Sequence, residues 1–346
     1  MKKLDFINEE ELLKKLDEKE KKSRIKYDEN EEDEDLKNVE IPEWIEKETE
    51  KNNFQSNKNN LNLGKVKTPL AMEEGWKNLP IERLPSKGFG YPKGFELAIR
   101  AATVSEIRHW STIDESDRLD IDDKLNNIIT KCMKIRWEGG PLEAYDLWYE
   151  DRFYVVMSIR DLTFIRGENK IFLPVVKNCN RENCQIPDKI ELKANLLDSF
   201  QLDEELIKRY NYETYSFNLV AKDGSFEMNL YIPTVGVTTI CRKIIAEKKE
   251  RGKKYDKSFA SVAPFIIPNW RNLNEKLYDQ YERESQSWSP LQFSVVDQIS
   301  KKINFATKSR IYTKCDSCGG EVTADISFPE GLRSLFIISD IFGQLL

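Results

Sequence analysis

Two pairs of cysteines, far apart in the sequence, constrain the fold of this chain more than any other feature. The first pair is Cys179 and Cys184, with four residues between them, and the second is Cys315 and Cys318, with two residues between them and two glycines directly after. Four thiolates in two close pairs meet the tetrahedral preference of Zn²⁺. The pattern predicts one structural zinc site with these four ligands. Because such a site has no open coordination position, it indicates structure and not catalysis.

The energetics of closing this site are favourable. Joining the two pairs closes a loop of about 130 residues, which costs roughly 4 kcal/mol of chain entropy. A structural zinc contributes on the order of 10–16 kcal/mol in zinc-finger peptides, so the metal can offset that cost. Two alternatives stay open at this point: four unpaired thiols in the core, or two separate turns.

Length, charge and cysteine content predict about two domains, a reducing compartment and no membrane-spanning segment. Its 346 residues suggest about two domains, with 33% charged residues and a mean hydropathy of −0.62. Six cysteines without an apolar N-terminal segment indicate a reducing compartment, and no apolar run reaches the roughly 20 residues that span a bilayer. Cys132 and Cys241 sit in apolar helical patterns, which predicts buried structural thiols.

The net charge of −6 is confined to the first 60 residues. This head contains 13 Lys and Arg against 19 Asp and Glu, whereas residues 61–346 contain 41 of each. A neutral body lacks the basic face that a general nucleic-acid-binding protein needs. The head also lacks a core pattern, so we expect it to be disordered in the free protein. Two apolar islands, around Leu12 to Leu16 and around Trp44, indicate docking segments; an idle solvated tail is the alternative.

The order of the patterns predicts an α+β fold, with mixed helices and antiparallel hairpins around a four-cysteine, zinc-ribbon-like knuckle. We divide the chain into a largely disordered acidic segment (1–65), an N-terminal α+β part (66–170), a zinc-knuckle α+β part (171–331) and an apolar C-terminal tail (332–346). Helices are predicted over 104–110, 122–135, 237–251, 274–284 and 291–305, and strands over 95–100, 189–196, 215–220, 226–232, 310–314 and 321–328. The apolar run 151–160 favours a strand, although its length also allows a helix.

Few residues qualify as catalytic candidates. His109 is the only histidine and lies in a predicted helix, where a surface or packing role is expected. The glycines in residues 84–92 lack the strand, helix and Gly-Lys-Ser/Thr context of a phosphate loop. Asp122 and Asp123 are adjacent carboxylates that could hold Mg²⁺, but we expect them to form a solvated helix face. The sequence therefore predicts no enzyme.

The C-terminal tail is apolar on one helical face, which Leu335, Ile338, Phe342 and Leu345 define by steps of three and four residues. A face of this kind must be covered, because exposure would favour aggregation. Either the tail packs on the body of its own chain or it inserts into a neighbouring subunit.

Five features in order resemble one family, the baseplate hub assembly and hub subunit proteins of T4-like contractile-tailed bacteriophages. They are Leu-Pro-Ser-Lys-Gly at 84–88 with Tyr91 and Pro92, the segment from Asp151 that ends in Ser-Ile-Arg at 158–160, a hairpin into the first cysteine pair, Ile-Pro-Thr-Val-Gly at 232–236 opening a helix, and a final hairpin with the second pair. The likeness covers about residues 80–330. This chain departs from it in the wider first pair and in the acidic head.

The resemblance implies a structural or assembly protein of a tail baseplate without catalysis. Its partners would be other baseplate and hub proteins in a hetero-oligomeric assembly, and neither nucleic acid nor membrane. It would be made in the host cytoplasm and localise to the virion, at least during assembly. The residues leave a different function open as well: a zinc-ribbon protein that acts on nucleic acid in phage transcription, using Lys308, Arg310 and Lys314 near the zinc.

Overall fold

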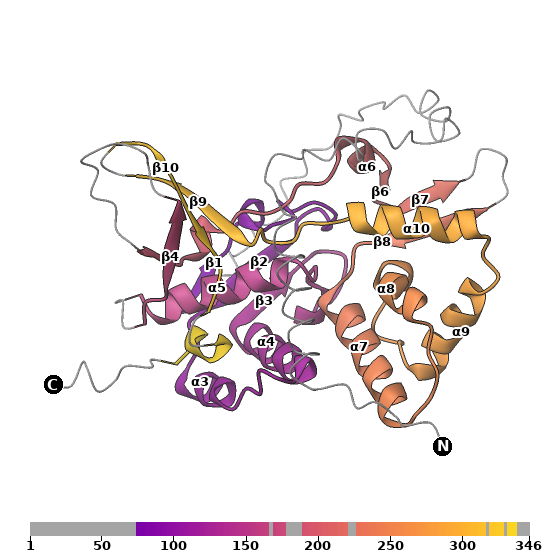
Figure 1. Ribbon diagram of the computed structural model, residues 1–346, viewed down its shortest axis with the longest axis horizontal. Coiled ribbons are helices and arrows are strands. Elements are labelled where there is room, and N and C mark those ends of the chain that lie inside the picture. The colour runs from indigo at the N-terminus through magenta and orange to yellow at the C-terminus, as the bar shows by residue number, and fades with distance from the viewer. Residues whose placement is uncertain are drawn as a thin grey trace, which may run out of the picture. The chain divides into compact units, whose positions relative to one another are not determined.

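The structure is a computed structural model, and it describes residues 74–165, 169–177, 189–220, 226–315, 318–328 and 331–337. These residues fall within one compact unit. They combine helices with antiparallel sheets, which confirms the predicted α+β class. The helices are α3 (Val104–Ser111), α4 (Arg118–Cys132), α5 (Asp151–Thr163), α6 (Glu204–Lys208), α7 (Val235–Glu250), α8 (Lys257–Ile266), α9 (Glu275–Ser285) and α10 (Pro290–Lys302) (Figure 1). The predicted disorder and docking role of residues 1–65 lie outside the described residues.

The strands form antiparallel sheets of three, four and three strands. The first sheet has the order β1 (Trp76–Asn78), β2 (Glu96–Arg100), β3 (Met133–Arg136). The second has the order β5 (Lys189–Glu191), β4 (Phe172–Lys177), β10 (Glu321–Asp325), β9 (Arg310–Lys314). The third has the order β6 (Tyr210–Asn211), β7 (Ser216–Val220), β8 (Glu227–Tyr231). Short 3-10 turns are η3 (Ile81–Arg83), η4 (Ala144–Asp146), η5 (Ala194–Leu196) and η6 (Leu332–Leu335).

Local sequence signals explain where several helices begin. Thr103 and Glu106 form the predicted capping box at the start of α3. Ser289 and Gln292 form a second box in front of α10, with Pro290 at the first helical position, where a missing N–H costs nothing. Both signals depend only on neighbours in sequence; the box of Thr103 and Glu106 was predicted and is confirmed, whereas that of Ser289 and Gln292 was not predicted.

The predicted helix over 122–135 is wrong at both ends. α4 begins four residues earlier, and Asp117 caps it by accepting a hydrogen bond from the Leu119 N–H. At the other end the chain leaves the helix after Cys132 and becomes β3, whose Met133 pairs with Ile99 of β2. A long-range strand pairing therefore overrides the helical pattern at this end.

Of the two alternatives left open for residues 151–160, the helix is correct and the strand is wrong, since this run is the helix α5. Residues 154–160 are all buried, so this part of the helix has no exposed polar face. Without such a face, hydrophobic periodicity cannot distinguish a buried helix from a buried strand.

Three of the five segments that carry the family resemblance meet at one buried junction, formed by Ser86, Tyr91, Trp148, Asp151 and Pro233. The Asp151 carboxylate accepts hydrogen bonds from the Ser86 N–H (2.8 Å), the Ser86 hydroxyl (2.7 Å) and the Tyr91 hydroxyl (2.8 Å). The Tyr91 oxygen in turn accepts from the Trp148 N–H at 2.9 Å. Because Asp151 begins α5, this cluster ties the 84–92 loop to that helix.

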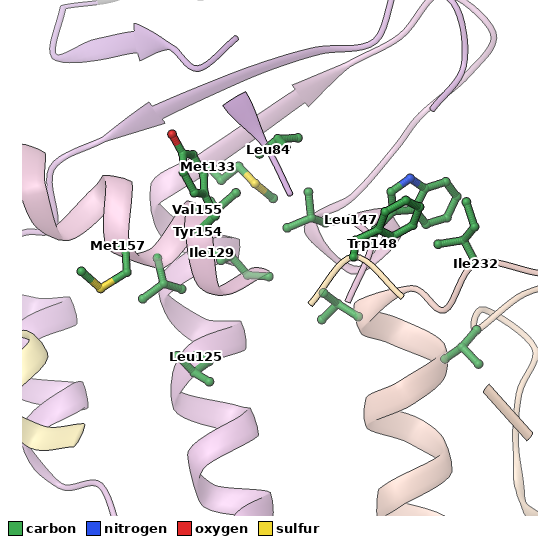
Figure 2. Close-up of a cluster of buried hydrophobic side chains, with 14 of the residues drawn as sticks. Leu84, Leu125, Ile129, Met133, Leu147, Trp148, Tyr154, Val155, Met157 and Ile232 are labelled. Atoms are coloured by element: carbon green, nitrogen blue, oxygen red, sulfur yellow. The ribbon is translucent and has the colours of Figure 1, made fainter. Parts of the chain in front are cut away.

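The 232–236 segment joins the same junction through its backbone. The Tyr149 N–H donates to the Pro233 carbonyl, and the Val235 N–H donates to the Leu147 carbonyl, both at 2.8 Å. Gly90 allows the close approach: a Cβ there would lie 2.6 Å from Ile232 Cδ1, and its φ of +76° favours glycine. Figure 2 shows Leu84, Leu147, Trp148 and Ile232 among the buried side chains of this region.

The junction predicts a pH dependence of stability. Burial raises the pKa of Asp151 to about 6, although the hydrogen bonds from Ser86 and Tyr91 oppose that shift. The folded protein therefore keeps a proton that the unfolded chain releases near pH 4, so the stabilising contribution is present below pH 4 and is lost as pH rises through 6. Relative to Asp151→Asn, wild type should lose about 3 kcal/mol of unfolding free energy across that interval. Urea denaturation of both proteins at several pH values measures this difference. A difference that stays constant or grows with pH would contradict it.

The first residues of the C-terminal tail pack on their own chain. The Phe336 ring meets Trp110 of α3 edge to face, with 5.3 Å between ring centroids, and both side chains are buried. Trp110 Nε1–H also donates to the Arg333 carbonyl at 3.2 Å. Of the predicted helical face, only Leu335 is described, and it too is buried. Insertion into a neighbour thus remains a prediction for residues 338–346, which lie outside the described part.

Truncating Phe336 should therefore destabilise the isolated protein. We expect Phe336→Ala to lower the unfolding free energy by about 3–5 kcal/mol, because it opens a cavity against Trp110. The exposed residue Leu291 offers a control, since Leu291→Ala should cost about 0.5 kcal/mol or less. Urea denaturation measures both, and equal effects would mean that residues 331–337 do not belong to the core.

Candidate metal centre

In the four-stranded sheet, β4 and β9, the strands that precede the two cysteine pairs, end at the same end of the sheet. β4 and β10 are antiparallel, with Lys177 opposite Thr323 and Val175 opposite Ala324. Moving along β4 toward Cys179 therefore means moving along β10 back toward Cys318. The hairpin from β9 to β10 turns at this same end, because Lys314 pairs with Glu321. Figure 1 shows β4, β9 and β10 side by side.

The second cysteine pair lies in a tight turn. The Cys315 N–H donates to the Gly320 carbonyl and the Gly319 N–H donates to the Cys315 carbonyl, both at 2.8 Å. Gly319 adopts a φ of +68°, the left-handed conformation that closes such a turn. The Gly320 N–H points to Cys318 Sγ at 3.4 Å. Backbone donors of this kind orient and stabilise metal-bound thiolates, so the turn fits half of a zinc site.

The other two predicted ligands, Cys179 and Cys184, lie outside the described residues. Their flanking strands are described: β4 ends at Lys177, two residues before Cys179, and β5 begins at Lys189, five residues after Cys184. Because β4 and β5 pair with each other, the segment that joins them leaves and re-enters the sheet at the end where Cys315 and Cys318 lie. Within the described ranges, no group of three or more His, Cys, Asp or Glu side chains could hold a metal. Four-cysteine ligation therefore stays a prediction, and the strand directions favour it.

Cys132 and Cys241 do not belong to this centre. They are buried in α4 and α7, as predicted from their apolar patterns. Burial raises the pKa of the Cys132 thiol to about 11 and that of Cys241 to about 12. Both therefore stay protonated at neutral pH and are poor metal ligands.

Three large apolar or aromatic side chains of the four-stranded sheet are exposed. Ala324 and Ile311 pair across β10 and β9 and are fully buried, so their side of the sheet faces the core. Tyr312 lies on the opposite side, between the polar pairs Arg310 with Asp325 and Lys314 with Glu321, and is 49% exposed. On β4, Phe172 and Val176 are 46% and 56% exposed. We call these three residues the outer strip. Aromatic side chains such as these are enriched at protein interfaces.

The interpretation of Asp122 as part of a solvated face is wrong. Asp122 is 2% exposed and pairs with Arg152 of α5 and Arg242 of α7, both at 2.6 Å. Burial alone would raise its pKa, but the two guanidinium groups hold that pKa below its usual value. Both guanidinium groups also stack on the Tyr149 ring. The carboxylate is thus used by two arginines and is not arranged for Mg²⁺; Asp123 lies on the exposed side as expected.

Two cavities lie away from the cysteines, and neither was predicted. The first, of about 340 Å³, is lined by Tyr149, Glu150, Arg152 and residues 306–309, among others. The second, of about 350 Å³, surrounds Arg160. His109 lines neither and is exposed on α3. Residues far apart in sequence form both cavities, which explains why no local pattern revealed them.

Three comparisons with known proteins found no relative of this chain. No family model matches the chain, and neither curated proteins nor solved structures show significant similarity to it. Among the helices described, none has the length and apolar character needed to cross a membrane.

Proposed function

We propose that this protein is a structural or assembly component of the baseplate of a contractile bacteriophage tail, at or next to the hub. The observation that carries the proposal is the buried junction. Three segments that resemble the hub family, around Ser86, Asp151 and Pro233, lie up to about 150 residues apart in sequence and yet contact one another. Their residues hold loops and helices together, which is the role expected of a family's shared framework.

We further propose that one structural Zn²⁺, bound by Cys179, Cys184, Cys315 and Cys318, fixes the end of the four-stranded sheet. The metal would hold the β4–β5 and β9–β10 connections together and supply rigidity, without catalysis. The outer strip of Phe172, Val176 and Tyr312 would then be presented on a stiff sheet to another baseplate protein. Aromatic residues of this kind are enriched at the core of protein interfaces.

Two of the three basic residues of the nucleic-acid alternative, Lys308 and Arg310, lie at the end of β9 away from Cys315 and do not favour that alternative. Lys308 pairs with Asp198 at 2.6 Å, and Arg310 pairs with Asp325 at 2.8 Å. Phosphate binding relies on cations that gain by releasing condensed counterions from the nucleic acid. Because each of these cations already has a carboxylate beside it, protein partners fit this surface better.

Complementation of a phage that lacks the gene tests the proposal. Wild-type protein should restore infectious particles, and mass spectrometry should find it in purified virions or in tail-assembly intermediates. Phe172→Glu with Tyr312→Glu should fold normally and fail to restore particles, because the charges block an apolar contact. Leu291→Glu, at an equally exposed apolar position on α10, should restore them. Normal tails in the complete absence of the protein would overturn the proposal.

A further inference from the structure

Arg160 is a buried cation whose donors are only partly used. Its side chain is 3% exposed, and it belongs to the Ser-Ile-Arg sequence at the end of the resemblance segment in α5. One terminal nitrogen donates to the Asn169 carbonyl at 2.6 Å, and the other reaches Asp161 Oδ1 only at 3.3 Å. Within the described residues, the Nε–H has no hydrogen-bond partner. A buried, unpaired donor on a charged group is costly, so it calls for an explanation.

A second buried arginine on the same helix has its hydrogen-bond donors paired. Arg152, eight residues earlier, donates to Asn126 at 2.9 Å, Asp122 at 2.6 Å and the Tyr149 hydroxyl at 3.1 Å. Asp161 cannot do the same for Arg160, because its second oxygen accepts the Ala194 N–H at 2.8 Å. Burial accordingly lowers the pKa of the Arg160 guanidinium.

The guanidinium lines the cavity of about 350 Å³, which has room for one or two side chains of a partner. Two more cations, Lys170 and Lys193, lie at its rim and share a single carboxylate, Glu191, at 4.0 and 3.2 Å. With Asp161, the lining thus carries three positive and two negative charges. Phe164 and the largely exposed Ile165 add an apolar wall.

We propose that this cavity binds one carboxylate side chain of a partner protein, with a neighbouring apolar residue against Phe164 and Ile165. A planar guanidinium matches a carboxylate with two parallel hydrogen bonds. A single excess positive charge suits one carboxylate, whereas the acidic groups in the lining would repel the successive phosphates of a nucleic acid. The inference rests on the proposed function only in placing the carboxylate on another baseplate protein.

The Nε–H resonance of Arg160, followed by ¹H–¹⁵N NMR on the full chain, reports directly on the site. We probe it with a capped tripeptide that has glutamate between two apolar residues, and with the matched glutamine peptide. The glutamate peptide should shift the Arg160 resonance, and the glutamine peptide should not. Arg160→Lys keeps the charge and loses the bidentate geometry, so calorimetry should find the glutamate peptide bound about 10-fold or more weakly by this variant. No shift with the glutamate peptide, or a shift with inorganic phosphate alone, would overturn the proposal.

A second variant, Lys193→Gln, should fold normally, because the Lys193 side chain is half exposed. A loss of binding in this variant therefore reports on the cavity and not on unfolding. Lys193→Gln should raise the dissociation constant about 2- to 5-fold, whereas Lys189→Gln on β5, outside the cavity, should leave it unchanged. Glu168 directly precedes Asn169, whose carbonyl accepts from Arg160, but it lies outside the described residues, so it is tested with a variant of its own. If Glu168→Gln shifts the Arg160 resonance without any peptide and wild type does not bind, Arg160 is satisfied within its own chain and the proposal is wrong. Because the peptides need no phage, this failure is distinct from failure of the baseplate role.

Discussion

Replacing Cys315 with serine should release the proposed zinc and lower the unfolding free energy by more than about 3 kcal/mol. A structural zinc contributes on the order of 10–16 kcal/mol in small peptides, so the loss of one of four thiolates removes far more than a neutral hydrogen bond would. The effect should be concentrated in the four-stranded sheet, because Cys315 directly follows β9. Zinc content by mass spectrometry and urea denaturation, measured on the same preparation, give the two readouts.

Cys132→Ser is the matched control for this experiment. Cys132 is a buried thiol in α4 that takes no part in the proposed site. Its substitution should cost some stability and leave the zinc content unchanged. If Cys315→Ser and Cys132→Ser both keep one zinc per chain, Cys315 is not a ligand.

Asp122→Asn should lower the unfolding free energy by about 3–5 kcal/mol, because it leaves two arginines without their buried counter-charge. Arg152 and Arg242 come from α5 and α7, so the carboxylate connects three helices. The interaction lowers the pKa of Asp122, and its stabilising contribution is therefore present at neutral pH and lost as pH falls below the usual Asp range.

The adjacent residue supplies the control. Asp123 pairs with Lys243 at 2.8 Å, but both side chains are more than 40% exposed. Asp123→Asn should change the unfolding free energy by about 0.5 kcal/mol or less, since exposed ion pairs contribute little. Urea denaturation at pH 7 compares the two variants. Equal effects would mean that the buried network does not hold the three helices together.

The sequence predicts best those features that depend on near neighbours. The capping box of Thr103 and Glu106, the class of the fold and most strands follow from local patterns, and the structure confirms them. α5 was harder to predict, because burial on every side erases the periodicity that identifies a helix. Asp122 looks like a surface residue until α5 and α7 bring two arginines to it, and no local pattern encodes that contact.

In the candidate metal centre, too, the local features could be predicted from the sequence and the long-range contacts could not. The spacing of Cys315 and Cys318 and the glycines after them predict a tight turn, and the structure confirms that turn. The direction of β4, which precedes the first pair, depends on the pairing of β4 with β10, across more than 140 residues. The Arg160 cavity is harder still to predict from the sequence, because its lining combines the end of α5 with residues in and around β5.

Zinc X-ray absorption on the full-length protein, purified without a metal-affinity tag, tests the central claim most directly. We expect about one zinc per chain, with four sulfur ligands at about 2.3 Å and no oxygen or nitrogen ligand. A protein that folds equally well without metal, or a zinc with only two sulfur ligands, would contradict it.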